Sequence, residues 1–288
     1  MNNLKSLLEG TKIIGEKNGI FLTEIVLRDE LEISKRSWER IYDFGVEDLK
    51  QERADFFNNK LEDHFRIISQ FKKFSKDEVC LEIGCGTAYV GEYLMKNFDV
   101  GFIGVDFNLR ILESLKQYFD EKALKKYLLI HSHISDMPLK DNVIDFIYGG
   151  GVIEHSADTL KTLKELNRVL KEGGVVFNTV PSFNLSWLPL RFYNNIPSTP
   201  ILRSIFEFIH SKIFKNKILE ENFGYELSFT QHNLKRIHKL AGFKKIDAGA
   251  MAFHPSPKKL KNRYLRNTYY SLSKLDFVVP VWYVSACK

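Results

Sequence analysis

The sequence has few cysteines and no long apolar segment. Cysteine occurs only at Cys80, Cys85 and Cys287, and this odd number without paired spacing predicts neither a disulfide framework nor a metal site. No apolar run approaches the roughly 20 residues that span a bilayer, and the first ten residues lack the apolar core of a signal peptide. We therefore expect a cytoplasmic protein in a reducing compartment, with no transmembrane segment and no bound metal.

Neither sign of charge dominates any one part of the chain. The formal net charge is +6, but the basic residues are scattered and do not form a stripe or tail. This distribution favours a small-molecule partner over a nucleic acid, and it leaves open whether the protein is a monomer or a homodimer. The sequence contains no internal repeat, and its 44% of hydrophobic residues suffices for a buried core.

The chain has two regions that differ in the pattern of their hydrophobic residues. Residues 1–75 have the pattern of helices, most clearly over 46–71, and we interpret them as a helical segment that caps a substrate. Residues 76–288 alternate seven short apolar runs with amphipathic ones, which predicts an α/β domain with a doubly wound, mostly parallel sheet covered on both faces. Residues 182–228 interrupt this alternation, and we expect a helical insertion there after the fifth strand, also capping the substrate.

A glycine loop follows the first predicted strand of this domain, in the stretch LEIGCGTA at residues 81–88. The dinucleotide fingerprint G-x-G-x-x-G needs a third glycine where Tyr89 stands, so that the next helix can pack closely on the strand. Glu82 would also repel a pyrophosphate, whereas S-adenosylmethionine has no phosphate and carries a sulfonium and an ammonium group. The loop therefore favours S-adenosylmethionine, with an NAD-dependent oxidoreductase as the disfavoured reading.

A second acidic residue ends the next predicted strand. Asp106 closes GFIGVD, 20 residues after Gly86. A carboxylate at a strand end accepts the ribose hydroxyls of either type of nucleotide cofactor. Asp106 therefore predicts a ribose site without choosing between them.

At this point the chain resembles the class I S-adenosylmethionine-dependent methyltransferases, in the branch that acts mainly on small molecules (type 11). The segments that carry the resemblance are LEIGCGTAYVGEYL, GVDFN, SDMPLKDNVIDFIYGGGVIEH, LKELNRVLKEGGVVFNTVPS and LAGFKKI, in family order. The likeness is strong over 77–181, loose over 229–288 and poor elsewhere. It implies the Rossmann-like methyltransferase fold, with S-adenosylmethionine as cofactor and S-adenosylhomocysteine as product.

The resemblance also implies which residues hold the cofactor. Asp106 would hold the ribose, and Phe107 would pack on the adenine face unless it is only a core residue. Three glycines follow the strand VIDFIY and would leave room for the methionine part and the acceptor, unless they form only a turn. The resulting assignments to the methionine part are Glu82, Gly84, Cys85, Gly86, Gly149 and Gly150.

The adenine site departs from the family pattern. The family places an acidic residue five positions before the proline of an LPF-like motif, and that position here is His133, counted from Pro138. A neutral imidazole accepts one hydrogen bond but is not a fixed anion. Ile134 would offer its backbone N–H to the adenine ring, and a shift by one residue would bring in Ser132 or Ser135.

His155, in the motif VIEH, is the candidate acid-base residue. It matches a histidine common in this branch, and an unperturbed imidazole accepts a proton near neutral pH. The alternative is that His155 only anchors the loop before the next helix.

Aromatic residues outside the basic fold are the candidates for acceptor binding. They are Trp38 and Tyr42 in the N-terminal segment and Trp187 in the insertion. Two interpretations stay open: a lid over an apolar or aromatic acceptor, or a small core that fixes these segments. The sequence thus predicts O-, N- or C-methylation of a small molecule, with an RNA methyltransferase or a non-catalytic cofactor-binding regulator as alternatives.

Overall fold

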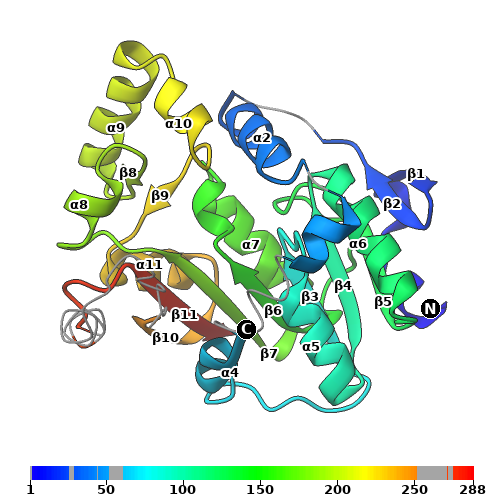
Figure 1. The fold of residues 1–288 in the computed structure, drawn as a ribbon. Helices are drawn as coiled ribbons and strands as arrows, with labels where there is room; N and C mark the ends of the chain where they lie inside the picture. The colour runs from blue at the N-terminus through cyan, green and yellow to red at the C-terminus, as the bar shows by residue number, and fades with distance from the viewer. Residues whose placement is uncertain (1, 26–28, 44, 52–60, 252–270, 272–274) are drawn as a thin grey trace.

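A nine-stranded sheet runs through the centre of the protein (Figure 1). The computed structural model describes residues 2–25, 29–43, 45–51, 61–251, 271 and 275–288. The strands stand in the order β1-β2-β5-β4-β3-β6-β7-β11-β10, and every neighbouring pair from β2 to β7 is parallel. Their bounds are β1 (Ile13–Lys17), β2 (Ile20–Thr23), β3 (Val79–Ile83), β4 (Gly101–Asp106), β5 (Tyr127–His131), β6 (Ile144–Gly150), β7 (Leu170–Pro181), β10 (Lys244–Ala250) and β11 (Val281–Cys287).

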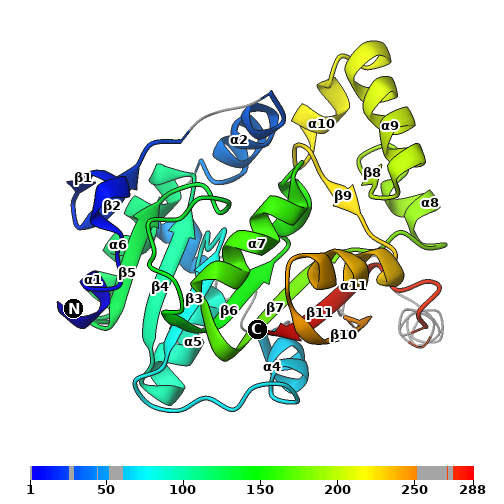
Figure 2. The same cartoon turned by 180° about the vertical axis from the view of Figure 1, so that it is seen from behind.

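Helices cover both faces of this sheet (Figure 2). On one face, Leu94 of α5 and Leu115 of α6 are buried with Phe102 of β4. On the other face, Leu163 of α7 and Leu234 of α11 are buried with residues of β6 and β7. The helices are α1 (Asn2–Lys5), α2 (Asp29–Ile41), α4 (Leu61–Ile68), α5 (Tyr89–Phe98), α6 (Leu109–Glu121), α7 (Thr159–Val169) and α11 (Gln231–Leu240), with short turns η1 (Gly10–Lys12) and η2 (Ile153–His155).

The doubly wound α/β fold expected from the sequence is confirmed, with two more strands than predicted. All seven predicted strands are present as β3 to β7, β10 and β11. The expectation that residues 1–75 are helical is wrong over Ile13–Thr23, where β1 and β2 form a hairpin that adds to β5. Its turn is Asn18-Gly19, with φ of 51° and 81°. Because an Asn-Gly pair adopts positive φ readily between apolar runs, it is the signal that should have predicted this hairpin.

Residues 182–228 form a lobe beside the sheet, with helices α8 (Trp187–Arg191), α9 (Pro200–Phe208), the π-turn η3 (Ile209–Ile213) and α10 (Lys217–Glu221). Two short parallel strands, β8 (Ile196–Pro197) and β9 (Leu227–Ser228), close the base of this lobe. Of the helix predicted over 46–71, α4 is observed, while residues 52–60 lie outside the described residues.

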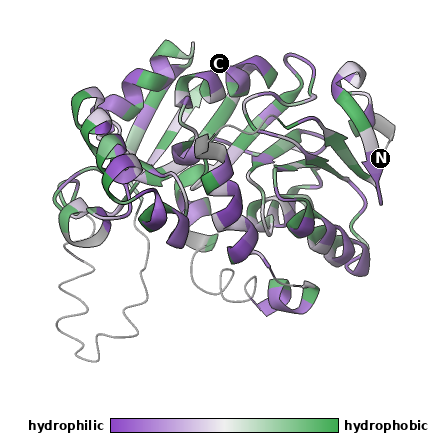
Figure 3. Cartoon of the chain, turned by 90° about the horizontal axis from the view of Figure 1, so that it is seen from above, coloured by the Kyte–Doolittle hydropathy of each residue, from purple (hydrophilic) through white to green (hydrophobic). Residues whose placement is uncertain are grey.

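The parallel strands bring four carboxyl ends to one edge of the sheet. β3, β4, β5 and β6 end there at Ile83, Asp106, His131 and Gly150. Helix α2 lies over this edge, where the Nδ2 of Asn108 donates to the carbonyl of Trp38 at 3.5 Å. The surrounding helices carry both hydrophilic and hydrophobic residues, as amphipathic helices do (Figure 3). None of the helices within the described ranges is long and apolar enough to cross a membrane.

Candidate active site

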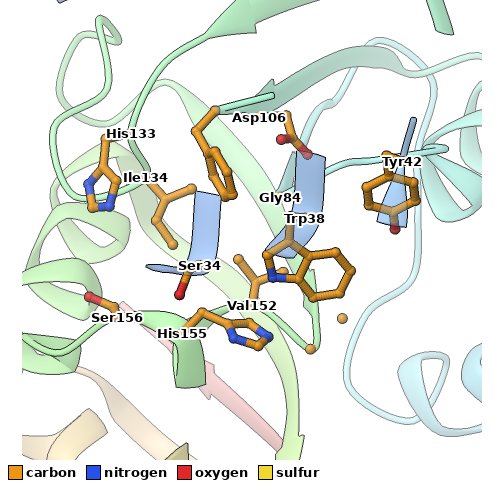
Figure 4. Close-up of a pocket in the computed structure, with 13 residues that line it drawn as sticks. Ser34, Trp38, Tyr42, Gly84, Asp106, His133, Ile134, Val152, His155 and Ser156 are labelled. Carbon is orange, nitrogen blue, oxygen red and sulfur yellow. The ribbon is translucent and has the colours of Figure 1, made fainter. Parts of the chain in front are cut away.

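A cavity opens at the carboxyl ends of these strands, beneath α2 (Figure 4). Its space not filled by protein atoms, including the part open to solvent, amounts to about 690 Å³. The residues that line it are Ser34, Trp38, Tyr42, Gly84, Asp106, Phe107, His133, Ile134, Gly150, Gly151, Val152, His155 and Ser156. Segments far apart in the sequence therefore meet around one space.

The glycine loop owes its shape to two positive φ angles and one buried carboxylate. Gly84 and Gly86 have φ of 51° and 46°, which L-residues with a side chain rarely adopt. Glu82 is buried, and its Oε2 accepts a hydrogen bond from the backbone N–H of Gly91 at 2.8 Å, within the first turn of α5. Glu82 therefore orients the loop through the start of the helix, where a carboxylate is also favoured by the helix dipole.

Helix α5 packs closely on the sheet after all, at Gly91. A Cβ at this glycine would lie only 2.1 Å from Cε2 of Phe102 on β4. The absence of a glycine at position 89 therefore does not exclude close packing, and that part of the sequence argument is wrong.

Asp106 is buried at the end of β4 with both carboxylate oxygens engaged. Its Oδ2 accepts from the N–H of Gly86 at 2.9 Å, and its Oδ1 accepts from the N–H of Asn108 at 2.9 Å. Burial raises the pKa of Asp106 to about 6, although these backbone hydrogen bonds oppose the rise. A carboxylate held this way beside a cavity can accept further hydrogen bonds from a ribose diol, since each oxygen has more than one acceptor site.

The predicted adenine residues lie at the same edge. Phe107, His133 and Ile134 all line the cavity. The N–H of Ser135 donates to Nδ1 of His133 at 3.2 Å, so Nδ1 carries no proton and the neutral ring carries it on Nε2. His133 would therefore present a donor at Nε2, suited to an adenine ring nitrogen, and not the acceptor that the adenine amine requires.

Besides Glu82, three predicted cofactor residues do not line the cavity. A Cβ at Gly149 would lie 2.3 Å from Oδ1 of Asn178, so this glycine permits packing inside the sheet and does not line the cavity. The side chain of Cys85 is buried, and only its backbone takes part in the loop, with its N–H bonded to the carbonyl of Val105 at 3.0 Å. Gly86 lies behind Tyr42, whose hydroxyl would be 3.1 Å from a Cβ at this glycine.

Helix α2 supplies the wall opposite the strands. Trp38 stacks on Tyr42 with ring centroids 5.5 Å apart, and it meets the ring of His155 edge-on at 5.3 Å. Figure 4 shows the Trp38 indole in the middle of this wall, with the His155 ring beside it. The cavity therefore has an aromatic roof over the polar ends of the strands.

His155 is both an anchor and a potential base. Its Nδ1–H donates to the carbonyl of Tyr225 at 2.8 Å, which fixes the tautomer and leaves the lone pair on Nε2. Burial lowers the pKa of His155, against the opposing effects of Glu226 and of this hydrogen bond. A neutral imidazole with an unprotonated Nε2 can accept a proton at neutral pH.

A buried acidic cluster lies behind His155. Glu154 is 2% exposed, and burial followed by the nearby charge of Glu226 raises its pKa well above the usual range. Nη1 of Arg191 lies 3.2 Å from Oε1 of Glu226. The negative charge of Glu226 opposes the lowering of the His155 pKa and would stabilise an imidazolium formed during proton transfer.

Trp187 does not line this cavity. Its indole packs edge-on against Phe183, Phe192 and Phe206, with centroids 5.1 to 5.4 Å apart, inside the insertion. It is 4% exposed. Trp187 is therefore part of a small core that fixes the insertion, which is one of the two interpretations left open by the sequence. It does not lie at the candidate acceptor site.

Three residues of the cavity were not predicted from the sequence. They are Ser34, Val152 and Ser156. Gly151, the third glycine of the predicted triplet, lines the cavity and has φ of 74°. Ser34 and Trp38 lie four residues apart on α2, so a helix predicted over SKRSWERI would have placed both on one face.

Comparisons with known proteins agree with this geometry. Residues 81–178 match the family model described as a methyltransferase domain. A demethylmenaquinone methyltransferase from Staphylococcus saprophyticus is 30% identical over 180 residues, which cover 58% of this chain and 70% of that enzyme. Another from Bacillus mycoides is 26% identical over 155 residues, and the chain spans 63% of its length.

A solved structure extends the likeness to the fold. Phosphoethanolamine N-methyltransferase 2 of Haemonchus contortus, in complex with phosphomonomethylethanolamine and S-adenosylhomocysteine, aligns with a TM-score of 0.60 and 16% identity, over 88% of this chain and 59% of that chain. The family model and the Staphylococcus saprophyticus relative confirm the family resemblance. The chain belongs to the class I S-adenosylmethionine-dependent methyltransferases.

Proposed function

We propose that this enzyme transfers the methyl group to a small, largely apolar or aromatic acceptor bound beneath α2, by O-, N- or C-methylation. The observation that carries the proposal is that the contacting rings of Trp38, Tyr42 and His155 line the same cavity as Asp106. Aromatic walls with few polar groups favour apolar ligands of modest size. The demethylmenaquinone methyltransferases among the relatives bear a name consistent with an acceptor of this class.

The residues of this chain would divide the work between binding and alignment. When bound, S-adenosylmethionine would supply the methyl group of its sulfonium by an in-line displacement, with S-adenosylhomocysteine as the leaving group. The glycine loop and Asp106 would hold the methionine and ribose parts, and His133 and Ile134 would meet the adenine. Helix α2 would exclude water and align the acceptor, which is the main contribution an enzyme makes to such a displacement.

His155 would accept a proton where the acceptor atom carries one. Nδ1 is committed to the Tyr225 carbonyl, so Nε2 is the nitrogen available for this step. The proton moves from the acceptor hydroxyl, amine or acidic carbon to Nε2, and the electron pair left on the acceptor forms the new bond to the methyl carbon. The negative charge of Glu226 would stabilise the charged imidazole.

A transfer assay with methyl-labelled S-adenosylmethionine tests this proposal. Parallel reactions contain aromatic diols, phenols, small amines or transfer RNA, and the label is counted after separation of organic-soluble product from RNA. We expect label in at least one class of aromatic small molecule and none in RNA. Label in RNA alone, or in no acceptor while calorimetry shows cofactor binding, would contradict the proposed acceptor class.

A further inference from the structure

Helix α9 of the insertion exposes its apolar residues to solvent. None of its residues is buried, and Ile201, Ile205 and Phe208 are 79%, 47% and 60% exposed. Their spacing of four and then three residues places them on one face of the helix. A helix of a globular protein normally turns such a face inward, but among the described residues nothing covers the apolar face of α9.

Neighbouring turns of the same lobe extend the exposed apolar surface. Helix α8 packs against α9 through Trp187 and Phe206, whose ring centroids are 5.4 Å apart. We call eight of the exposed apolar residues of the lobe the insertion patch: Leu188, Phe192, Tyr193, Ile201, Leu202, Ile205, Phe208 and Ile213. The patch belongs to the part of the chain that protrudes beside the sheet in Figures 1 and 2.

Positive charge borders the insertion patch at its far end. Lys212, Lys215 and Lys217 are exposed where η3 leads into α10. Within the described ranges none of the three forms an ion pair, whereas the nearby Glu207 is turned toward Arg203 and Tyr225. An apolar helix face next to unpaired lysines is the pattern of a helix that lies in the interface of a membrane.

We propose that the insertion patch binds the surface of an anionic lipid bilayer. The apolar face of α9 would enter the boundary between headgroups and acyl chains, and the three lysines would meet the anionic headgroups. A second copy of this chain fits the surface less well, because each chain carries a formal charge of +6 and pairing would bring like charges together. The proposal goes beyond the methyl-transfer reaction, since it concerns a surface that none of the residues lining the cavity shares.

Vesicle binding by the full chain tests the proposal. The protein is sedimented with vesicles of phosphatidylcholine alone and with vesicles containing about one third phosphatidylglycerol, at low and high salt. We expect binding to the anionic vesicles that weakens at high salt, because salt screens the lysine contribution. Absence of binding to the anionic vesicles would overturn the proposal.

Three variants identify the surface that binds. Replacing both Ile205 and Phe208 by serine should weaken binding to anionic vesicles by about tenfold or more, since two apolar side chains would lose their burial. Replacing Lys212, Lys215 and Lys217 by glutamine should weaken it about tenfold or more on anionic vesicles only. The matched control is Leu240→Ser, which removes an apolar side chain that is 57% exposed on α11, away from the patch.

Two results would contradict the assignment to this surface. One is equal vesicle binding by the Ile205→Ser, Phe208→Ser protein and by the Leu240→Ser control, with circular dichroism showing that both are folded. The other is a dimer by light scattering that the same double substitution dissociates, which would make a second copy the occupant of the patch.

Discussion

The two halves of the cavity are built in different ways. The floor consists of short loops that follow β3, β4, β5 and β6, where Gly84, Asp106, Ile134 and Gly150 lie within three residues of a strand end. The roof consists of α2 together with the contacts that hold it to the insertion. Position along the chain therefore determines the floor, whereas packing between distant segments determines the roof.

Contacts of α2 with α10 and with the turn after it hold the roof in place. The N–H of Tyr225 donates to Oγ of Ser34 at 3.1 Å, and Oγ of Ser37 donates to the carbonyl of Glu220 at 3.0 Å. Gly224, with φ of 81°, is required because a Cβ there would lie 2.5 Å from Cα of Ser34. Tyr225 then accepts from His155, so the roof and the candidate base share one support.

Because the two halves are built separately, we expect substitutions in the floor to alter the affinity for the cofactor. Substitutions in the roof should alter the KM or kcat for the acceptor. A substitution that changes cofactor affinity or acceptor kinetics alone would support this division. A substitution that changes both quantities equally would contradict it.

The largest expected effect belongs to His155→Asn. The Asn amide can still donate to the Tyr225 carbonyl, but it cannot accept a proton as the base. We expect kcat to fall about 100- to 10,000-fold for an acceptor that must lose a proton, with cofactor affinity in calorimetry almost unchanged. Full activity of this variant would leave His155 as an anchor only.

Substitutions at two tryptophans should distinguish the cavity roof from the core of the insertion. Trp187→Ala should lower the free energy of unfolding by about 3 kcal/mol or more, because a large aromatic side chain is lost from a buried cluster. Trp38→Ala should raise KM for the acceptor while leaving urea unfolding close to that of the parent. Unfolding in urea and steady-state kinetics check the pair, and the opposite assignment of the two effects would refute the roof described here.

Asp106→Asn tests the floor. Loss of the charged acceptor should weaken binding of S-adenosylhomocysteine about tenfold to a hundredfold, as expected for hydrogen bonds to a charged group. Isothermal calorimetry measures this, with Asp99→Asn as the control because Asp99 lies at the opposite, amino-terminal end of β4 and pairs with Lys126. Equal affinities for the two variants would remove Asp106 from the ribose site.

The pH dependence of cofactor binding gives the smallest effect. The pKa of Asp106 without cofactor is about 6, and hydrogen bonds from the ribose hydroxyls favour the ionised form. Cofactor binding therefore lowers this pKa, so affinity should be constant above pH 7 and fall by up to about tenfold per unit as the pH drops below 6. Calorimetry from pH 7.5 to 5 in the parent and in Asp106→Asn should show a slope in the parent only.

The sequence predicts the floor well because strand ends and glycine loops are local features. Asp106 could be placed from its spacing after the glycine loop, and His133 from the family resemblance, since parallel strands bring their carboxyl ends to the same edge. Residue spacing did not predict which positions face the cavity and which face a neighbouring strand. Gly149 and Asn178 face each other across neighbouring strands, and nothing in the order of residues shows that this glycine serves packing.

The roof was predictable only as a list of aromatic residues. Trp38 and Trp187 have similar surroundings in the sequence, each preceded by serine and close to further aromatics. Their separation into cavity wall and insertion core depends on how α2 and α8 pack, which is a property of the whole fold. The β1–β2 hairpin was missed for another reason, because its Asn-Gly turn lay in a segment read as helical throughout.

A crystal structure with S-adenosylhomocysteine tests the division into floor and roof most directly. We expect the ribose hydroxyls to donate hydrogen bonds to the carboxylate of Asp106. We also expect the sulfur of S-adenosylhomocysteine to face the space bounded by Trp38 and His155. A sulfur directed away from these two side chains, or a ribose bound without Asp106, would contradict it.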